Sequence, residues 1–204
     1  MPINISYYNE NAIQLAKQYD SIEFEVVHQS WQAYWPSFGE RVLDVGAGSG
    51  RDARWFNQQG CLVVAVEPAK EFRQLGLSSP SPDVQWLNDV LPGLTKVNKL
   101  PNIFDLILVS AVWVHLDSTQ RAESLVTLSK LLCTNGTLVI TLRHGCFKDS
   151  REEHAVSVEE IGQLTQNSEL TICCVADSSD SLNRDEVFWQ TVVLAKSDFD
   201  IGGE

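Results

Sequence analysis

The chain has 204 residues, of which 44% are apolar and 21% charged, as expected for a globular protein with one sizeable core. Its formal net charge of -12 argues against a nucleic-acid partner, since no local basic patch offsets it. No apolar run reaches the length of a membrane-spanning helix. The first residues have neither the basic nor the apolar region of a secretory signal.

The cysteines are odd in number and show no Cys-x-x-Cys spacing; they are Cys61, Cys133, Cys146, Cys173 and Cys174. This usage predicts reduced thiols in a cytoplasmic protein, with neither a disulfide framework nor a metal site.

In chain order, the first predicted elements are two helices. Apolar residues at helical spacing indicate one helix that ends near Tyr19 and a second from about Ile22 to Tyr34. Pro36 and Gly39 end the second. We therefore expect residues 1–40 to form an N-terminal helical cap.

A strand, a glycine loop and a helix follow. Val42 to Val45 is a short buried run, and Gly46, Gly48 and Gly50 come after it at every second position. Such a loop lets a nucleotide-like ligand lie against bare peptide, although a purely structural turn is an alternative. A dinucleotide fingerprint would need its third glycine at the position of Arg51, which disfavours a pyrophosphate on the helix N-terminus.

The second predicted strand ends in Glu67 and Pro68. An acid at this place can accept hydrogen bonds from both hydroxyls of a ribose; the alternative is a solvated strand end. A third, edge-type strand over residues 84–87 precedes Asp89 and Val90.

The fourth and fifth strands place further polar side chains where an open α/β sheet binds its ligands. After residues 104–109, Trp113 is a candidate pocket wall and His115 a candidate general base, because its unperturbed pKa lies near neutrality. After residues 137–142, Arg143 is a candidate for an anionic acceptor and His144 for a proton. Both could equally line a solvated loop.

The last two strands, over residues 170–176 and 186–195, are joined by a polar loop too short for a crossover helix, so we expect an antiparallel hairpin. Arg184 in that loop is a second anion-binding candidate. Residues 197–204 read as an acidic tail.

The spacing Asp44-x-Gly46-x-Gly48-x-Gly50 resembles the first motif of the class I S-adenosylmethionine-dependent methyltransferases. Phe-Asp-Leu-Ile at 104–107 and Leu-Leu-x-x-x-Gly-x-Leu-Val-Ile at 131–140 are also typical of that family. The resemblance implies an α/β fold over residues 41–196: a Rossmann-like, seven-stranded, mostly parallel sheet with an antiparallel last strand and helices on both faces. It also implies S-adenosylmethionine as cofactor and a small-molecule methyl acceptor.

The family resemblance assigns cofactor binding to Tyr7, Asp44, Gly46, Ala47, Gly48, Gly50, Arg51, Glu67, Pro68, Asp89, Val90 and Ser110. Within this set, Tyr7 with its neighbour Tyr8 would act as a lid, or simply pack a helix onto the body. Asp89 would bind the adenine amino group, or serve as a turn residue. His115 in this family often only structures its loop.

Two other functions stay open at this point: a nicotinamide oxidoreductase, and a non-catalytic module that keeps the fold to bind a partner. The run Ser110-Ala111-Val112-Trp113 stands where amino-methylating nucleic-acid enzymes carry Asn/Asp-Pro-Pro-Tyr/Phe. This difference weakens a nucleobase acceptor.

Overall fold

The computed structural model describes residues 2–81, 83–101, 103–166 and 168–197. Its strands are β1 (Arg41–Val45), β2 (Leu62–Val66), β3 (Gln85–Leu87), β4 (Phe104–Val109), β5 (Leu132–His144), β6 (Leu170–Ser179) and β7 (Phe188–Lys196). Its α-helices are α1 (Pro2–Tyr19), α2 (Phe24–His28), α3 (Arg51–Gln58), α4 (Lys70–Ser78), α5 (Ser118–Leu131) and α6 (Val158–Thr165). Three 3-10 turns complete the set: η1 (Gln29–Tyr34), η2 (Val97–Lys99) and η3 (Trp113–His115).

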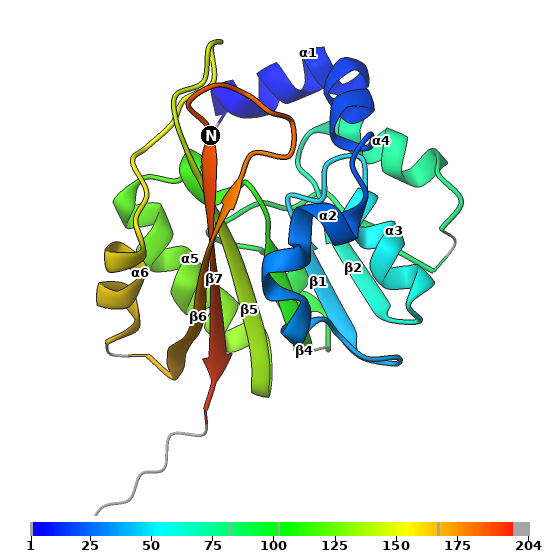
Figure 1. Ribbon diagram of the computed structural model, residues 1–204. Helices are drawn as coiled ribbons and strands as arrows, with labels where there is room; N and C mark the ends of the chain where they lie inside the picture. Colours follow the sequence, from blue (N-terminus) through cyan, green and yellow to red (C-terminus); the bar gives the residue numbers. More distant parts are fainter. Residues whose placement is uncertain (1, 82, 102, 167, 198–204) are drawn as a thin grey trace, which may run out of the picture.

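The strands form one sheet in the order β3-β2-β1-β4-β5-β7-β6 (Figure 1). Neighbours from β3 to β5 pair in parallel, whereas β7 is antiparallel to both β5 and β6. The predicted fold, including the terminal hairpin, is therefore confirmed. The strand order changes direction between β1 and β4, and in open α/β sheets the ligand crevice lies at the carboxyl ends of the strands at such a switch point.

Each face of the sheet carries its own hydrophobic core because side chains alternate along a strand. Leu43 belongs to the core under α5 and α6, and its neighbour Val42 to the core under α2, η1 and α3. Nearly continuous apolar strands are the expected consequence of a parallel sheet covered on both sides.

The N-terminal segment divides into two parts with different packing. Phe24 and Trp31 are each 1% exposed and belong to the sheet core. In contrast, α1 packs against α4 through a small cluster that includes Leu15 and Phe72, and lies across the carboxyl end of the sheet (Figure 1). The domain boundaries expected at residues 40 and 196 stay predictions. The expected acidic tail, apart from Ser197, lies outside the described residues.

Among the described helices, none combines the length and apolar composition that crossing a bilayer requires.

Candidate active site

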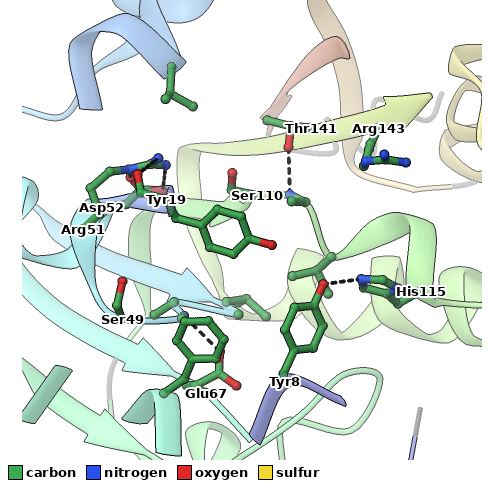
Figure 2. Close-up of a pocket in the computed structure, with 18 of the residues that line it drawn as sticks. Tyr8, Tyr19, Ser49, Arg51, Asp52, Glu67, Ser110, His115, Thr141 and Arg143 are labelled. Atoms are coloured by element: carbon green, nitrogen blue, oxygen red, sulfur yellow. Dashed lines mark hydrogen bonds and ion pairs between the residues drawn. The ribbon is translucent and has the colours of Figure 1, made fainter. Parts of the chain in front are cut away.

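A cavity of about 240 Å³ opens at the carboxyl ends of β1, β2 and β4. Its wall combines the glycine loop, the ends of these strands, α1, and the loops that follow β5 and β6. Figure 2 shows the rings of Tyr8 and Tyr19 projecting from α1 into this space. The cavity therefore lies at the switch point of the sheet, with α1 as its cover.

The glycine loop turns sharply and leaves one peptide bare. Gly46, Gly48 and Gly50 have φ of 76°, 57° and 87°, a region in which side chains are strained. A Cβ at Gly46 would collide with Val112, and one at Gly50 would lie 2.7 Å from the Trp86 ring. At Gly48 the nearest atom would be 3.8 Å away, so this peptide is open to a ligand.

Glu67 stands opposite that peptide, at the end of β2. One of its carboxylate oxygens accepts the Gly48 N–H at 2.9 Å, and the other accepts the Ala69 N–H at 2.7 Å. Burial raises the pKa of Glu67 to about 7, even though these two hydrogen bonds favour the charged form. Each carboxylate oxygen keeps capacity for a further donor from the cavity.

Asp44 lies behind the loop and does not line the cavity. It is 1% exposed; it accepts a hydrogen bond from the Ala53 backbone, and its Oδ2 has no partner among the described residues. Burial, followed by the nearby Asp52, raises its pKa well above the usual value. The cofactor-binding role that the family resemblance assigns to Asp44 stays a prediction.

The first turn of α3 contributes a paired charge to the cavity wall. Arg51 donates to both oxygens of Asp52, at 2.6 and 3.1 Å, and to the Tyr19 carbonyl. Burial by itself would raise the pKa of Asp52, but Arg51 and then His28 hold it well below its usual value. Asp52 is therefore an anion at the helix N-terminus.

The loop after β3 is organised by Asp89. Its carboxylate accepts four backbone N–H bonds, from Val90, Thr95, Lys96 and Val97, at 2.6–3.1 Å. Asp89 and Val90 both line the cavity. Asp89 thus acts as a turn residue in this structure, and its contact with the adenine amino group stays a prediction.

At the end of β4 the chain reverses direction. Ser110 lines the cavity, and Ala111 adopts a φ of 59° while its N–H donates to Thr141 Oγ1 at 2.8 Å. Positive φ at a non-glycine residue is uncommon and occurs often at functional sites. The strained turn brings Val112 and His115 to the cavity.

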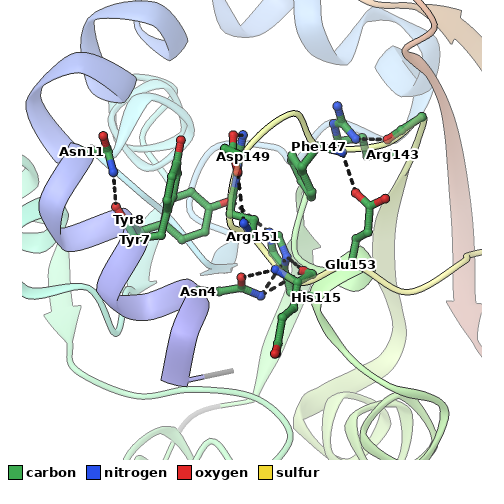
Figure 3. A network of polar contacts seen from close by, with 12 residues as sticks. Asn4, Tyr7, Tyr8, Asn11, His115, Arg143, Phe147, Asp149, Arg151 and Glu153 are labelled. Carbon is green, nitrogen blue, oxygen red and sulfur yellow. Dashed lines mark hydrogen bonds and ion pairs between the residues drawn. The ribbon is translucent and has the colours of Figure 1, made fainter.

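His115 is held at both ring nitrogens (Figure 3). Nδ1 lies 2.9 Å from the Glu152 carbonyl, which can only accept, so Nδ1 carries the proton and Nε2 accepts the Tyr8 hydroxyl at 2.9 Å. Asn4 fixes the same loop by pairing with the Glu152 backbone at 2.8 and 3.1 Å. Burial lowers the pKa of His115 to about 4, so the ring is neutral near pH 7.

Arginines gather at the far end of the cavity, where Arg143, Arg151 and Arg184 line it. Arg151 forms a two-point ion pair with Asp149 (2.7 and 2.8 Å). Arg184 does the same with Asp180 (2.6 and 2.9 Å), and Trp189 Nε1 donates to that carboxylate as well.

The comparisons with known proteins agree with this geometry. Residues 9–184 match the family model described as a methyltransferase domain. The chain belongs to this methyltransferase domain family. It is 27% identical over 105 residues, 48% of its length, to an uncharacterized methyltransferase of Alkaliphilus oremlandii (strain OhILAs), and the match covers 44% of that relative. The chain spans less than half the length of the curated relatives it matches.

Solved structures share the fold of this methyltransferase domain at low identity. A magnesium protoporphyrin IX methyltransferase from Synechocystis PCC 6803, crystallised with bound SAH, is 13% identical with a TM-score of 0.73 over 96% of this chain and 99% of that one. A 1,6-didemethyltoxoflavin-N1-methyltransferase from Burkholderia thailandensis is 18% identical with a TM-score of 0.68, over 97% and 88%.

Most of the predicted cofactor set lines the cavity of the methyltransferase domain. These residues are Gly46, Ala47, Gly48, Arg51, Glu67, Pro68, Asp89, Val90 and Ser110. Gly50 is absent from the wall and is instead the N-cap residue of α3. Tyr7 is absent too: Tyr8, its neighbour on α1, faces the cavity, and the Tyr7 ring lies 5.0 Å from the Arg151 guanidinium.

Two residues predicted for catalysis and substrate binding lie elsewhere. Trp113 is fully buried in the core under α5 instead of forming a pocket wall, because the turn at Ala111 changes the direction of its side chain. His144 hydrogen-bonds Gln190 at 3.0 Å and stacks on Phe188 outside the cavity. Since side chains alternate along β5, the inward position of Arg143 requires that His144 face the other way.

Sequence reasoning missed several residues of the wall. Phe147 and Arg151 belong to the loop after β5, and Tyr19 and Thr141 line the cavity from α1 and β5. Thr141 could have been found from its period-2 relation to Arg143. The loop carries no periodic signal that would have placed Phe147 or Arg151.

Proposed function

We propose that the chain transfers the methyl group of S-adenosylmethionine to a small-molecule acceptor. The observation that carries the proposal is the buried Glu67 carboxylate, which reaches across to the bare Gly48 peptide in the cavity of a methyltransferase-family fold. Its remaining acceptor capacity fits the two ribose hydroxyls of an adenosyl group.

The charges around the glycine loop favour this cofactor over a dinucleotide. Asp52 places a carboxylate in the first turn of α3, where a pyrophosphate would otherwise bind. A methionine group carries both an ammonium and a carboxylate. It therefore fits beside the Arg51–Asp52 pair, and the buried Asp44 oxygen, which has no partner among the described residues, is a further acceptor close to the loop.

When bound, S-adenosylmethionine supplies an electrophilic methyl group on a sulfonium. The chain's own residues then have to hold the two ligands in line and exclude water, and such alignment is worth roughly 7–11 kcal/mol. Tyr8, Tyr19 and Phe72 cover the cavity as a set of neighbouring rings. The Tyr19 and Phe72 rings are stacked with their centroids 6.4 Å apart, and the Tyr8 and Phe72 rings are tilted with their centroids 6.0 Å apart.

His115 remains our candidate general base, acting through the Tyr8 hydroxyl. An acceptor proton would pass to the Tyr8 oxygen while the Tyr8 proton moves to His115 Nε2, 2.9 Å away. The low pKa of His115 makes it a weak base. Fixing the position of Tyr8 is therefore its second candidate role.

We further propose that the protein works in the cytoplasm and does not act on nucleic acids. All five cysteines are free thiols, which fits a reducing compartment, and the formal net charge of -12 disfavours a nucleic-acid partner.

The test is calorimetric titration of the purified protein with S-adenosylhomocysteine and, separately, with NAD. We expect binding of the first ligand only, and about tenfold or greater weakening in Glu67→Gln, which loses a charged acceptor. Glu123→Gln on the exposed side of α5 is the matched control. Binding of NAD alone would support an oxidoreductase, and binding of neither would support a non-catalytic module.

Methyl transfer itself is tested by incubating the protein with labelled S-adenosylmethionine and a small-molecule extract. Label in an extract component, lost in Glu67→Gln and kept in Glu123→Gln, is the expected result. Incorporation into nucleic acid in a parallel reaction would contradict the small-molecule assignment.

A further inference from the structure

Four arginines line the cavity, and one of them differs from the rest. Arg51, Arg151 and Arg184 each form an ion pair with an acidic neighbour. Arg143 forms none with any residue that the structure describes. It is also buried, with 6% of its surface exposed.

The hydrogen bonds of Arg143 leave most of its guanidinium free. Nη1 donates to the Gly145 carbonyl. Nε is buried, and neither Nε nor Nη2 has a hydrogen-bond partner among the described residues. The guanidinium carbon lies 4.1 Å from the centre of the Phe147 ring, a cation–π contact that holds the group in place. Figure 3 shows this arrangement beside Arg151.

A buried guanidinium without a counterion is unfavourable. Burial, and then the charges of Arg184 and Arg151, lower the pKa of Arg143. The charges of Glu153 and then Asp180 offset this effect in part, but Glu153 accepts the Phe147 N–H at 2.7 Å and Asp180 is paired with Arg184. The site therefore has donors and positive charge that the described residues do not use.

We propose that Arg143 determines acceptor specificity by binding an oxyanion of the methyl acceptor, a carboxylate or a phosphate. The inference rests on the proposed function, since it assigns the arginine-lined end of the same cavity to the acceptor. Guanidinium matches both oxyanions with parallel N–H donors. Contact with a cation lowers the nucleophilicity of an oxyanion, so this group is the anchor of the acceptor and the methyl group goes to another atom.

The experiment reads Arg143 directly by NMR in protein labelled with ¹⁵N-arginine. The Nε–H signal is assigned by its loss in Arg143→Lys. Acetate, inorganic phosphate and neutral acetamide are then titrated at constant ionic strength, with and without saturating S-adenosylhomocysteine. We expect a saturable shift of the Arg143 signal with acetate or phosphate and none with acetamide. The anion with the lower dissociation constant identifies the class of oxyanion.

Two variants give the affinity side of the test. Arg143→Gln should weaken binding of the preferred anion about tenfold or more, as expected for loss of a charge-assisted pair, and Arg143→Lys should weaken it less because the charge remains. Arg41→Gln, at the exposed start of β1, should leave it unchanged. Circular dichroism and unchanged S-adenosylhomocysteine affinity show that each variant is folded.

The outcomes separate the two claims. If S-adenosylhomocysteine binds but neither anion moves the Arg143 signal, or acetamide moves it equally, the anion site is refuted and the methyltransferase proposal stands. If S-adenosylhomocysteine fails to bind while an anion binds at Arg143 in the ligand-free protein, the oxyanion site stands and its assignment to a methyl acceptor is lost.

Discussion

Binding of the cofactor should release a proton from Glu67. Burial raises the pKa of this carboxyl to about 7, against an unperturbed value near 4.3. About half of the ligand-free molecules therefore hold a proton on Glu67 at pH 7. Ribose hydroxyls that donate to the carboxylate stabilise its charged form and so lower this pKa.

The expected release follows from that titration. Binding of S-adenosylhomocysteine should release about half a proton at pH 7, close to one near pH 6 and almost none near pH 8, and the apparent dissociation constant should weaken about tenfold from pH 8 to pH 6. Calorimetry in buffers with different ionisation enthalpies measures the number of protons. Asp44 also has a raised pKa, so the diagnostic quantity is the difference between wild type and Glu67→Gln.

The same linkage fixes the sign of a stability effect. A carboxyl whose folded-state pKa is raised contributes stability that is fully present below its unfolded pKa and is lost as the pH rises through the folded pKa, here from about 4.3 to about 7. The difference corresponds to about 4 kcal/mol. For the proton release on binding, identical binding heats in all buffers at pH 6–7, with tight binding of S-adenosylhomocysteine, would refute the reasoning. Glu67 would then not change its protonation when the ligand binds.

Three further changes test the rest of the site and its frame. Gly46→Ala should lower both thermal stability and S-adenosylhomocysteine affinity. The positive φ costs roughly 1–2 kcal/mol of stability, and the overlap of the new Cβ with Val112 adds to this. An unchanged melting temperature would contradict this prediction. Tyr8→Phe leaves the buried Nε2 of His115 without its donor and should cost roughly 1–3 kcal/mol in denaturant unfolding. Asp117→Ala removes the capping box of α5 and should cost roughly 0.5–2 kcal/mol without any change in ligand affinity.

The sequence was sufficient for the sheet because strand formation here follows local pattern. The run over residues 104–109 is apolar and β-rich, and it forms β4 at those bounds. The glycine spacing predicted a loop of bare peptide after the first strand, and Gly46, Gly48 and Gly50 form such a loop with positive φ. Helix ends depend on more than local pattern: α5 is capped by Asp117, whose side chain accepts from the Gln120 N–H, a detail that hydrogen-bond geometry decides.

Side-chain direction beyond the end of a strand was not predictable in the same way. Side chains alternate between the two faces along β5. Once Arg143 is placed facing the cavity, this alternation would have excluded His144 from the cavity wall. The same alternation does not continue after β4, because the chain changes direction at Ala111, which has a positive φ. Trp113 is consequently buried while His115 reaches the cavity.

The two ends of the cavity differ in charge, and this difference connects the two proposals. At the glycine loop lie three acids, Asp44, Asp52 and Glu67, of which Asp52 forms an ion pair with Arg51. At the other end, Arg151 pairs with Asp149 and Arg184 with Asp180, whereas Arg143 has no ion pair among the described residues. A methyl donor with a net positive charge and an acceptor with a negative group would each reduce the unfavourable charge at its own end. Electrostatics would thereby orient both ligands in the cavity before any contact with the reacting atoms is made.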